Sequence, residues 1–203
     1  MPEFLTKINW VDIACAVIFL RAIYVARKTG FLIELSKLIS LIFTACLSLH
    51  YFLVISDLIL NRVNLEKSPL QFLETSPLQF TDFVVFTLFL TIFYALLSIL
   101  RSIIFNLIRP NQQARPVSFP SAVTAMLLSV VRGFLISSLL IFSLYISKVD
   151  YLNKNSRKAY FGKSLFGIST GIYKNIWEGV ASKFLPNEKI NSVVFDHEKE
   201  FYQ

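Results

Sequence analysis

The chain has 203 residues, of which 55% are apolar and only 16% carry a charge. Aromatic residues make up 15% of it, and the mean hydropathy is +0.60. This composition excludes an ordinary water-soluble domain and is typical of a polytopic membrane protein. The net charge of +7 does not indicate nucleic-acid binding, because the basic residues interrupt apolar runs, where Lys and Arg act as interfacial anchors.

The first elements expected along the chain are two apolar segments, 8–26 and 38–55, joined by the basic turn 27–30 (Arg-Lys-Thr-Gly). At about 1.5 Å per residue, each segment is long enough to cross a hydrocarbon core of about 30 Å, the second only narrowly. The sequence therefore predicts a transmembrane hairpin.

Three charged residues lie inside or beside the apolar zone of this hairpin. Arg21 precedes the turn, and Glu34 and Lys37 follow it. A charge in this position is costly in a membrane unless it snorkels to the surface or is paired. Because Arg21 and Glu34 are at nearly the same distance from the turn, we expect them to form an ion pair, and the helix dipole favours Glu34 near the start of its helix.

A polar connector follows at 57–82, and it contains the repeat SPLQF at 68–72 and again at 76–80. Its prolines predict turns or a short surface helix. A third span is expected at about 83–100, continuing along the interface to residue 108. The basic connector after it is short and has a proline near each end, where a helix would stop.

The fourth span, at about 121–147, exceeds the roughly 20 residues that a crossing helix needs, which allows it to tilt. Arg132 lies near its middle. Three environments are open for this guanidinium: a snorkelling anchor at the basic interface, a charged cluster with Glu34 and Arg21 that joins three helices, or contact with lipid phosphate or a pore.

Small side chains recur at every fourth position of the fourth span. They are Ala125, Ser129, Gly133 and Ser137. Small residues let helix backbones approach closely, so this stripe predicts packing against another helix of the bundle, with a homodimer face as the alternative. Leu139 lies off the stripe, and a change to phenylalanine is expected to be tolerated there.

The tail, 148–203, is polar except for the segment 160–185. Apolar residues repeat there at three-to-four spacing: Phe161, Leu165, Ile168, Ile172, Ile176, Val180 and Phe184. This spacing predicts an amphipathic helix, lying on the membrane surface or against the bundle, with Tyr173 and Trp177 at headgroup level. The last stretch, 187–203, has no apolar period and is expected to be frayed. The predicted fold is therefore all-α, with a four-helix transmembrane domain at 1–147 and this tail.

Several of these features also resemble a known family. The opening residues 10–12 (Trp-Val-Asp), the basic pair, Gly30-Phe31 and Glu34 look like the start of the colicin V production protein family, small bacterial inner-membrane proteins. The segment 129–136 (Ser-Val-Val-Arg-Gly-Phe-Leu-Ile) is similar to that family's last span. The resemblance covers roughly residues 10–147. The family tends to carry an Asp-Arg pair and two glycines leading into the last span, so no role tied to that acid carries over to this chain, which has in those places Ser121, Ala122, Ala125 and Ser129.

The distribution of basic residues predicts the orientation. The two short connectors and the span ends beside them hold most of the basic residues of the first 147 positions, whereas the connector 57–82 holds two basic residues against four acidic ones. The positive-inside rule then places the short connectors in the cytoplasm and both termini outside it. The basic start of the tail, 148–163, favours the opposite orientation.

The residue types that a catalytic or metal site requires are scarce. His50 and His197 are far apart in sequence, and the common nucleotide, zinc-protease and serine-hydrolase motifs do not occur. Cys15 and Cys46 both lie in apolar spans, where a free thiol behaves as a small hydrophobic group. We therefore expect no enzymatic activity and no cofactor. His50 and Asp12 are expected to be interfacial residues, with a functional role as the alternative for Asp12.

Two functions are open. The resemblance implies an accessory protein of the bacterial inner membrane, connected with the production or export of the toxin colicin V and with envelope homeostasis. The alternative is a small oligomeric channel or transporter with intramembrane charges lining a polar path. The expected partners are the lipid bilayer and either further copies or other envelope membrane proteins, and nucleic acid is not among them. The depth of the charges favours the accessory protein, because four of them lie within snorkelling reach of one interface: Arg21, Glu34, Lys37 and Arg101.

Overall fold

The computed structural model describes residues 9–62, 77–108, 118–147 and 149–203. Within these ranges, every regular element is a helix, as the sequence predicts. The elements are α1 (Trp10–Ala26), α2 (Phe31–Arg62), α3 (Pro77–Ile108), α4 (Phe119–Ile146), α5 (Asp150–Lys158), α6 (Gly162–Ile176), the π-helical turn η4 (Trp177–Ala181), α7 (Ser182–Phe184) and α8 (Val193–Tyr202).

Three helices are long and apolar enough to cross a membrane. They are α2 over Phe31–Ile59, α3 over Thr81–Leu107 and α4 over Phe119–Ile146. α1 has only 17 residues, so its length and composition do not establish the predicted fourth span. α2 extends further than predicted at both ends, because neither proline nor glycine interrupts its sequence. The first SPLQF copy and the basic connector after α3 lie outside the described residues.

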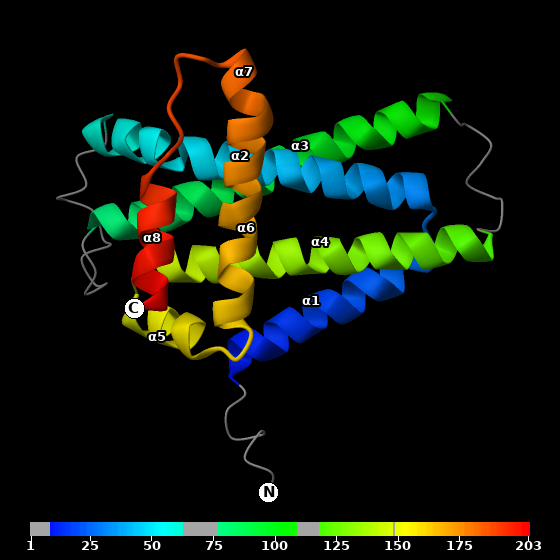
Figure 1. Ribbon diagram of the computed structural model, residues 1–203, viewed down its shortest axis with the longest axis horizontal. Coiled ribbons are helices and arrows are strands. Elements are labelled where there is room, and N and C mark those ends of the chain that lie inside the picture. The colour runs from blue at the N-terminus through cyan, green and yellow to red at the C-terminus, as the bar shows by residue number, and fades with distance from the viewer. Residues whose placement is uncertain (1–8, 63–76, 109–117, 148) are drawn as a thin grey trace, which may run out of the picture.

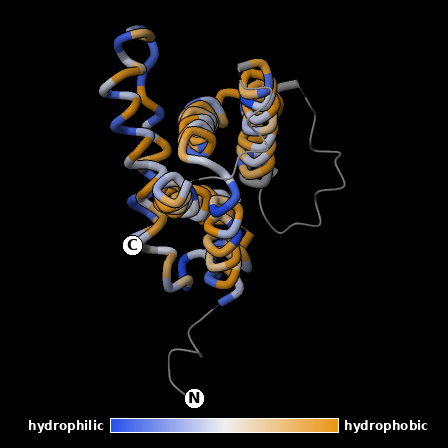
Figure 2. Tube along the Cα trace, turned by 90° about the vertical axis from the view of Figure 1, so that its right-hand side faces the viewer, coloured by the Kyte–Doolittle hydropathy of each residue, from blue (hydrophilic) through white to orange (hydrophobic). Residues whose placement is uncertain are grey.

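The four long helices run side by side along the long axis of the molecule, in the order α3, α2, α4, α1 (Figure 1). α1 packs mainly against α4, and α3 mainly against α2. Figure 2 shows that these helices are largely hydrophobic, whereas the helical tail mixes hydrophobic and hydrophilic residues.

An aromatic core joins α2, α3 and α4 near the tail. The ring centroids of Phe52 and Phe86 are 5.7 Å apart, and those of Phe86 and Phe142 are 5.3 Å apart. Phe142 also contacts Phe166 of α6, at 5.6 Å. This core holds one end of the long helices together and fixes α6 across them.

The tail packs on this end of the bundle. α6 crosses α2 and α4, and α5 and α8 lie beside it (Figure 1). The expectation of a frayed C-terminus is wrong, because α8 buries Val194 and Phe201 and stacks the Phe201 ring on Phe166 at 4.0 Å. Val194 and Phe201 lie seven positions apart on one helical face, but the other apolar residues of 187–203 do not repeat at a helical spacing with them, so the segment showed no clear period.

Candidate functional site

The turn between α1 and α2 brings the start of α4 against the start of α2. The backbone N–H groups of Lys28 and Thr29 donate to carbonyls of the last turn of α1, at 3.1 Å each. The Ser121 hydroxyl oxygen accepts the N–H of Phe31 at 3.1 Å, and so satisfies a donor at the beginning of α2 that has no partner within the helix. α2 and α4 therefore begin at the same level and run in the same direction.

Glu34, one turn into α2, is almost completely buried, with 1% of its surface exposed. Its Oε1 accepts the Thr29 hydroxyl at 2.6 Å and lies 2.5 Å from Lys37 Nζ. Its Oε2 lies 2.7 Å from Arg132 Nη1 of α4. This last contact is an ion pair without hydrogen-bond alignment, and it joins α2 to α4 at a single guanidinium nitrogen.

Arg132 reaches this carboxylate by extending back along its own helix. Its Cα lies about 16 Å beyond that of Ser121 along α4, whereas Glu34 is only about 5 Å into α2, at ~1.5 Å per residue. Side chains on a helix point toward its N-terminus, which here is the basic end of the bundle. The guanidinium thus points toward the interface as an anchor would, but it ends on Glu34 and is 7% exposed.

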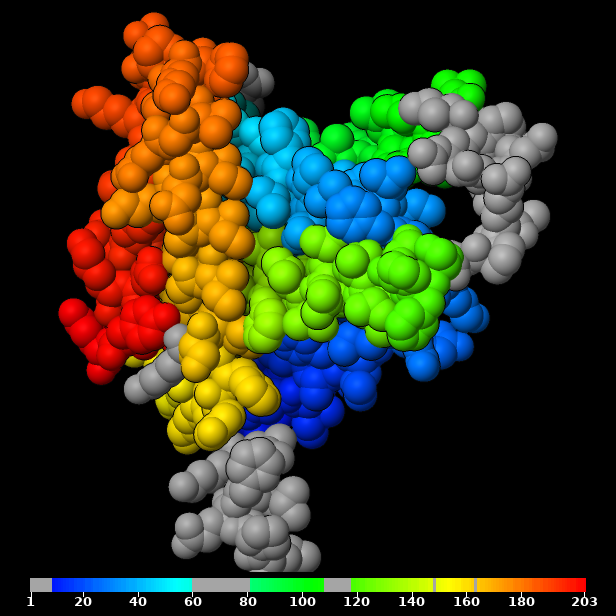
Figure 3. Space-filling model, turned by 45° about the vertical axis from the view of Figure 1, so that its right-hand side comes forward, coloured from blue at the N-terminus to red at the C-terminus, as the bar shows by residue number. Residues whose placement is uncertain are grey.

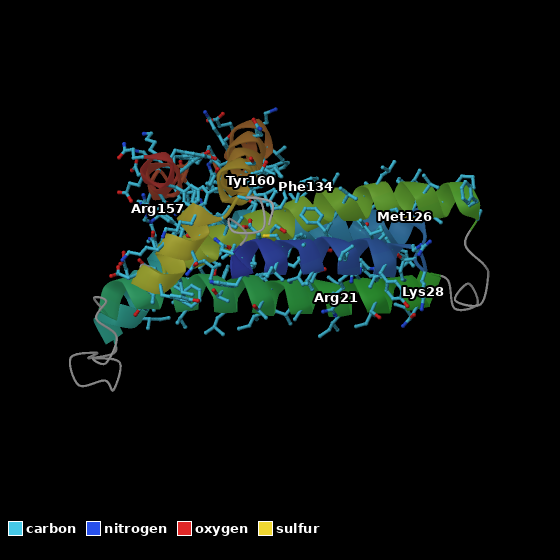
Figure 4. All side chains as sticks on the ribbon, turned by 90° about the horizontal axis from the view of Figure 1, so that it is seen from below. Arg21, Lys28, Met126, Phe134, Arg157 and Tyr160 are labelled. Carbon is cyan, nitrogen blue, oxygen red and sulfur yellow. The ribbon has the colours of Figure 1, made fainter. Side chains whose placement is uncertain are left out.

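The predicted pair between Arg21 and Glu34 is wrong. Arg21 is exposed on α1 and makes no ion pair with Glu34, whose charged partners are Lys37 and Arg132 (Figure 4). Equal distance from the turn does not fix the rotation of α1 about its axis. α1 packs chiefly on α4, and this packing turns Arg21 outward.

The small-residue stripe of α4 is used inside one chain. Ala125, Ser129, Gly133 and Ser137 are all buried. A Cβ added at Gly133 would lie 2.8 Å from the Phe19 ring of α1, so glycine permits this close approach. Bundle packing therefore accounts for the stripe. Leu139 is buried as well, at 2% exposed, so a larger phenylalanine is now expected to be overpacked there.

Changing Gly133 to leucine is expected to push α1 away from α4 and to lower stability by about 1 to 3 kcal/mol or more, the usual range for overpacking. Leu127→Phe is the matched control, since Leu127 is 64% exposed on the same helix. Thermal unfolding of the two variants in detergent checks this. Equal midpoints would show that the contact with Phe19 does not limit the packing.

Asp12 connects the start of α1 to the tail. The carboxylate is 4% exposed and accepts the backbone N–H groups of Tyr160 and Phe161, at 3.2 and 3.1 Å. It also accepts the N–H of Asn9 at 3.2 Å, completing a capping box at the start of α1. Asp12 is thus buried within the chain, and its place at the membrane interface stays a prediction. Asp12 holds the turn that leads into α6.

A family model described as Colicin V production protein matches residues 11–167. The chain belongs to the colicin V production protein family. The match confirms the resemblance seen in the sequence and extends it past α4, through α5, into the first turns of α6. It thus spans both the Glu34–Arg132 pair and the contact of Asp12 with the tail. No curated protein and no solved structure matches the chain.

In this colicin V production family protein, His50 forms a second polar cluster between α2 and α6 that the sequence did not predict. Its ring stacks on Trp177 at 3.8 Å. Its Nδ1 lies 2.9 Å from the Tyr173 hydroxyl, and its Nε2 lies 3.0 Å from the Glu188 carboxylate. The Tyr173 oxygen accepts the N–H of Asn191 at 3.0 Å, which leaves its own proton for Nδ1.

Burial raises the pKa of Tyr173 to about 12, so the phenol stays protonated and can donate near neutral pH. The partners of His50 lie more than a hundred positions away from it in the sequence, and no local motif marks them. The usable signals were the pair of aromatic residues Tyr173 and Trp177, expected at headgroup level, and His50, expected at the interface. The cluster docks α6 onto α2.

Metal ligands are not grouped in the part of the chain that the structure describes. No set of three or more His, Cys, Asp or Glu side chains there could hold a metal ion. Cys15 and Cys46 are both free thiols. The site consists of two polar clusters that each join helices, one near the basic turn and one beneath α6.

Proposed function

We propose that this chain is a non-enzymatic accessory protein of the bacterial inner membrane that supports the production or export of colicin V and envelope homeostasis. Membership of the family and three membrane-spanning candidates support this proposal. The observation that carries it is that Glu34 and Arg132 are both buried and form an ion pair with each other. Each charge is neutralised within the same chain, and removing either partner would leave an uncompensated buried charge.

The alternative, a channel or transporter, would need charges that face a water-filled path. Glu34 and Arg132 are 1% and 7% exposed, and they contact each other. Arg101, nearer the basic end of α3, donates to Ser98 Oγ at 2.8 Å. These contacts favour a structural role for the intramembrane charges.

We further propose that α1 is a fourth span and that the segment around α6 is the predicted amphipathic helix. The exposed side of α1 is apolar through Ile13, Val17 and Leu20, which suits lipid contact, and the exposed Arg21 on it lies within snorkelling reach of the basic end. The positive-inside rule favours short connectors in the cytoplasm and both termini outside it. α3 is the span available to a second copy or to other envelope membrane proteins, since only 11% of its most apolar window is buried.

Removing the chain from a bacterium that secretes colicin V tests this function. We expect less toxin in the medium and greater sensitivity to detergent, both restored by the parent chain and by the lipid-facing control Leu127→Phe. Unchanged secretion and resistance would contradict the proposal. Ion flux through vesicles that contain only the purified chain would instead favour the channel.

A further inference from the structure

Exposed apolar side chains on α3 and α4 stop at two levels about 13 Å apart along the bundle, at ~1.5 Å per residue. On α4, large apolar residues are exposed up to Phe134, and 135–146 expose none. Among the α3 side chains whose burial the structure describes, from residue 81 on, large apolar ones are exposed only from Leu88 onward. Thr87, just before it, contacts Ser143 of α4, nine residues beyond Phe134, at 3.1 Å. On α2, Val54 and Leu58 are exposed about one to two turns beyond His50.

α6 crosses the bundle between these two levels. The Ser138 hydroxyl of α4 accepts the N–H of Ser169 at 2.9 Å, and His50 of α2 contacts Tyr173. From the start of α4 to Ser138, and from the start of α2 to His50, the helix axis measures about 28 Å at ~1.5 Å per residue. That length matches a hydrocarbon core of about 30 Å. The distance from the basic end of the bundle to α6 is therefore that of a bilayer interior. The band of exposed apolar residues ends about one turn before α6 on α4 and about 7 Å beyond it on α3.

The two flanks of α6 differ in chemistry. An added Cβ at Gly167 would lie 2.9 Å from Glu198 Oε1 and 3.2 Å from the Tyr202 hydroxyl, so α8 lies against this flank. At 3.6 residues per turn, the exposed residues Lys174 and Glu178 share the flank with Gly167. The opposite flank points away from α8, toward the side of α6 where the long helices extend to the basic turn (Figure 1). It carries the partly exposed Ile168, Ile172 and Ile176, and Phe161 just before the helix is exposed as well. Ile168 and Ile172 also pack in part against the core.

We infer that α6 lies flat in the headgroup region of the bilayer. Its isoleucine flank meets the acyl chains of the surrounding lipid, and its Lys174 flank faces water together with α8. Figure 3 shows α6 as a ridge standing on α2 and α4. Its apolar flank continues the lipid-exposed band of the spans, which identifies the bilayer as the occupant of this surface. Val54 and Leu58 then lie at headgroup depth, where single exposed apolar side chains are common.

This arrangement differs from that of an ordinary amphipathic surface helix. The face that such a helix would insert is already buried in the bundle, through Leu165, Phe166 and Tyr173. Lipid can reach only the flank beside that face. The inference is independent of the role in colicin V production, because it depends only on the contacts of α6 and on the position of the apolar band.

Spin labels two positions apart on α6 test this. In the full chain with Cys15 and Cys46 replaced by alanine, a nitroxide is attached to Ile176→Cys or to Lys174→Cys. The protein is placed in vesicles of phosphatidylethanolamine and phosphatidylglycerol. The ratio of collisions with oxygen, which dissolves in lipid, to collisions with a water-soluble nickel chelate is expected to be several-fold higher at position 176 than at 174.

Equal ratios at the two positions would overturn the inference and place α6 in water. Protection of position 176 from both reagents would also overturn it, since protein and not lipid would then cover the flank. The pair Ile172→Cys and Glu178→Cys repeats the comparison along the same two flanks if a first variant fails to fold.

Discussion

Replacing Arg132 with leucine is expected to lower the free energy of unfolding by about 3 to 5 kcal/mol, the range for breaking a desolvated ion pair by removing one partner. The carboxylate of Glu34 would remain buried with Lys37 as its only cation. Unfolding followed by circular dichroism in a fixed detergent measures this loss.

Two further variants separate the pair from a simple loss of charge. Arg132→Lys keeps the charge and is expected to lose less, since the parent contact uses one guanidinium nitrogen. Arg101→Leu removes a cation that donates only to Ser98 Oγ among the described residues, so its loss should be smaller than that of Arg132→Leu. If Arg132→Leu were no more damaging than Arg101→Leu, the ion pair would have no special role.

Asp12→Ala is expected to release the tail from α1. The change removes a buried carboxylate from the N–H groups of Tyr160 and Phe161, and hydrogen bonds to a charged group contribute roughly 1.5 to 3 kcal/mol each. We expect faster hydrogen exchange first in α5 and the beginning of α6. The long helices should stay protected, because the aromatic core between them is intact.

Asp150→Ala is the control for this change, since Asp150 is an exposed acid at the start of α5. Its effect should stay within about 0.5 kcal/mol, as for most surface substitutions. Exchange that rises equally in all helices of the Asp12 variant would show that the carboxylate stabilises the whole fold. Unchanged exchange would show that it does not hold the tail.

The parts of the fold that depend on local composition could be predicted from the sequence. Runs of apolar residues marked α2, α3 and α4, and the spacing of small side chains marked the buried side of α4 around Gly133. Glu34 could be identified as an intramembrane charge because no apolar span tolerates a free carboxylate. A contact of Glu34 with Arg132 was part of one of the three environments left open for the Arg132 guanidinium.

The rest depends on contacts that no local pattern records. Arg21 was assigned to Glu34 by depth alone, and the rotation of α1 on α4 overrules that assignment. His50 and Asp12 both find their partners in the tail, more than a hundred positions away. Long-range packing therefore decided the places where sequence reasoning failed.

A double-mutant cycle on Glu34 and Arg132 measures directly whether the two charges neutralise each other inside the bundle. Glu34→Gln, Arg132→Gln and the double variant are unfolded under the same conditions. We expect the double variant to lose less stability than the sum of the single changes, with a coupling of about 1 to 3 kcal/mol, because it leaves neither of these two charges buried alone. Additive losses would contradict the pair.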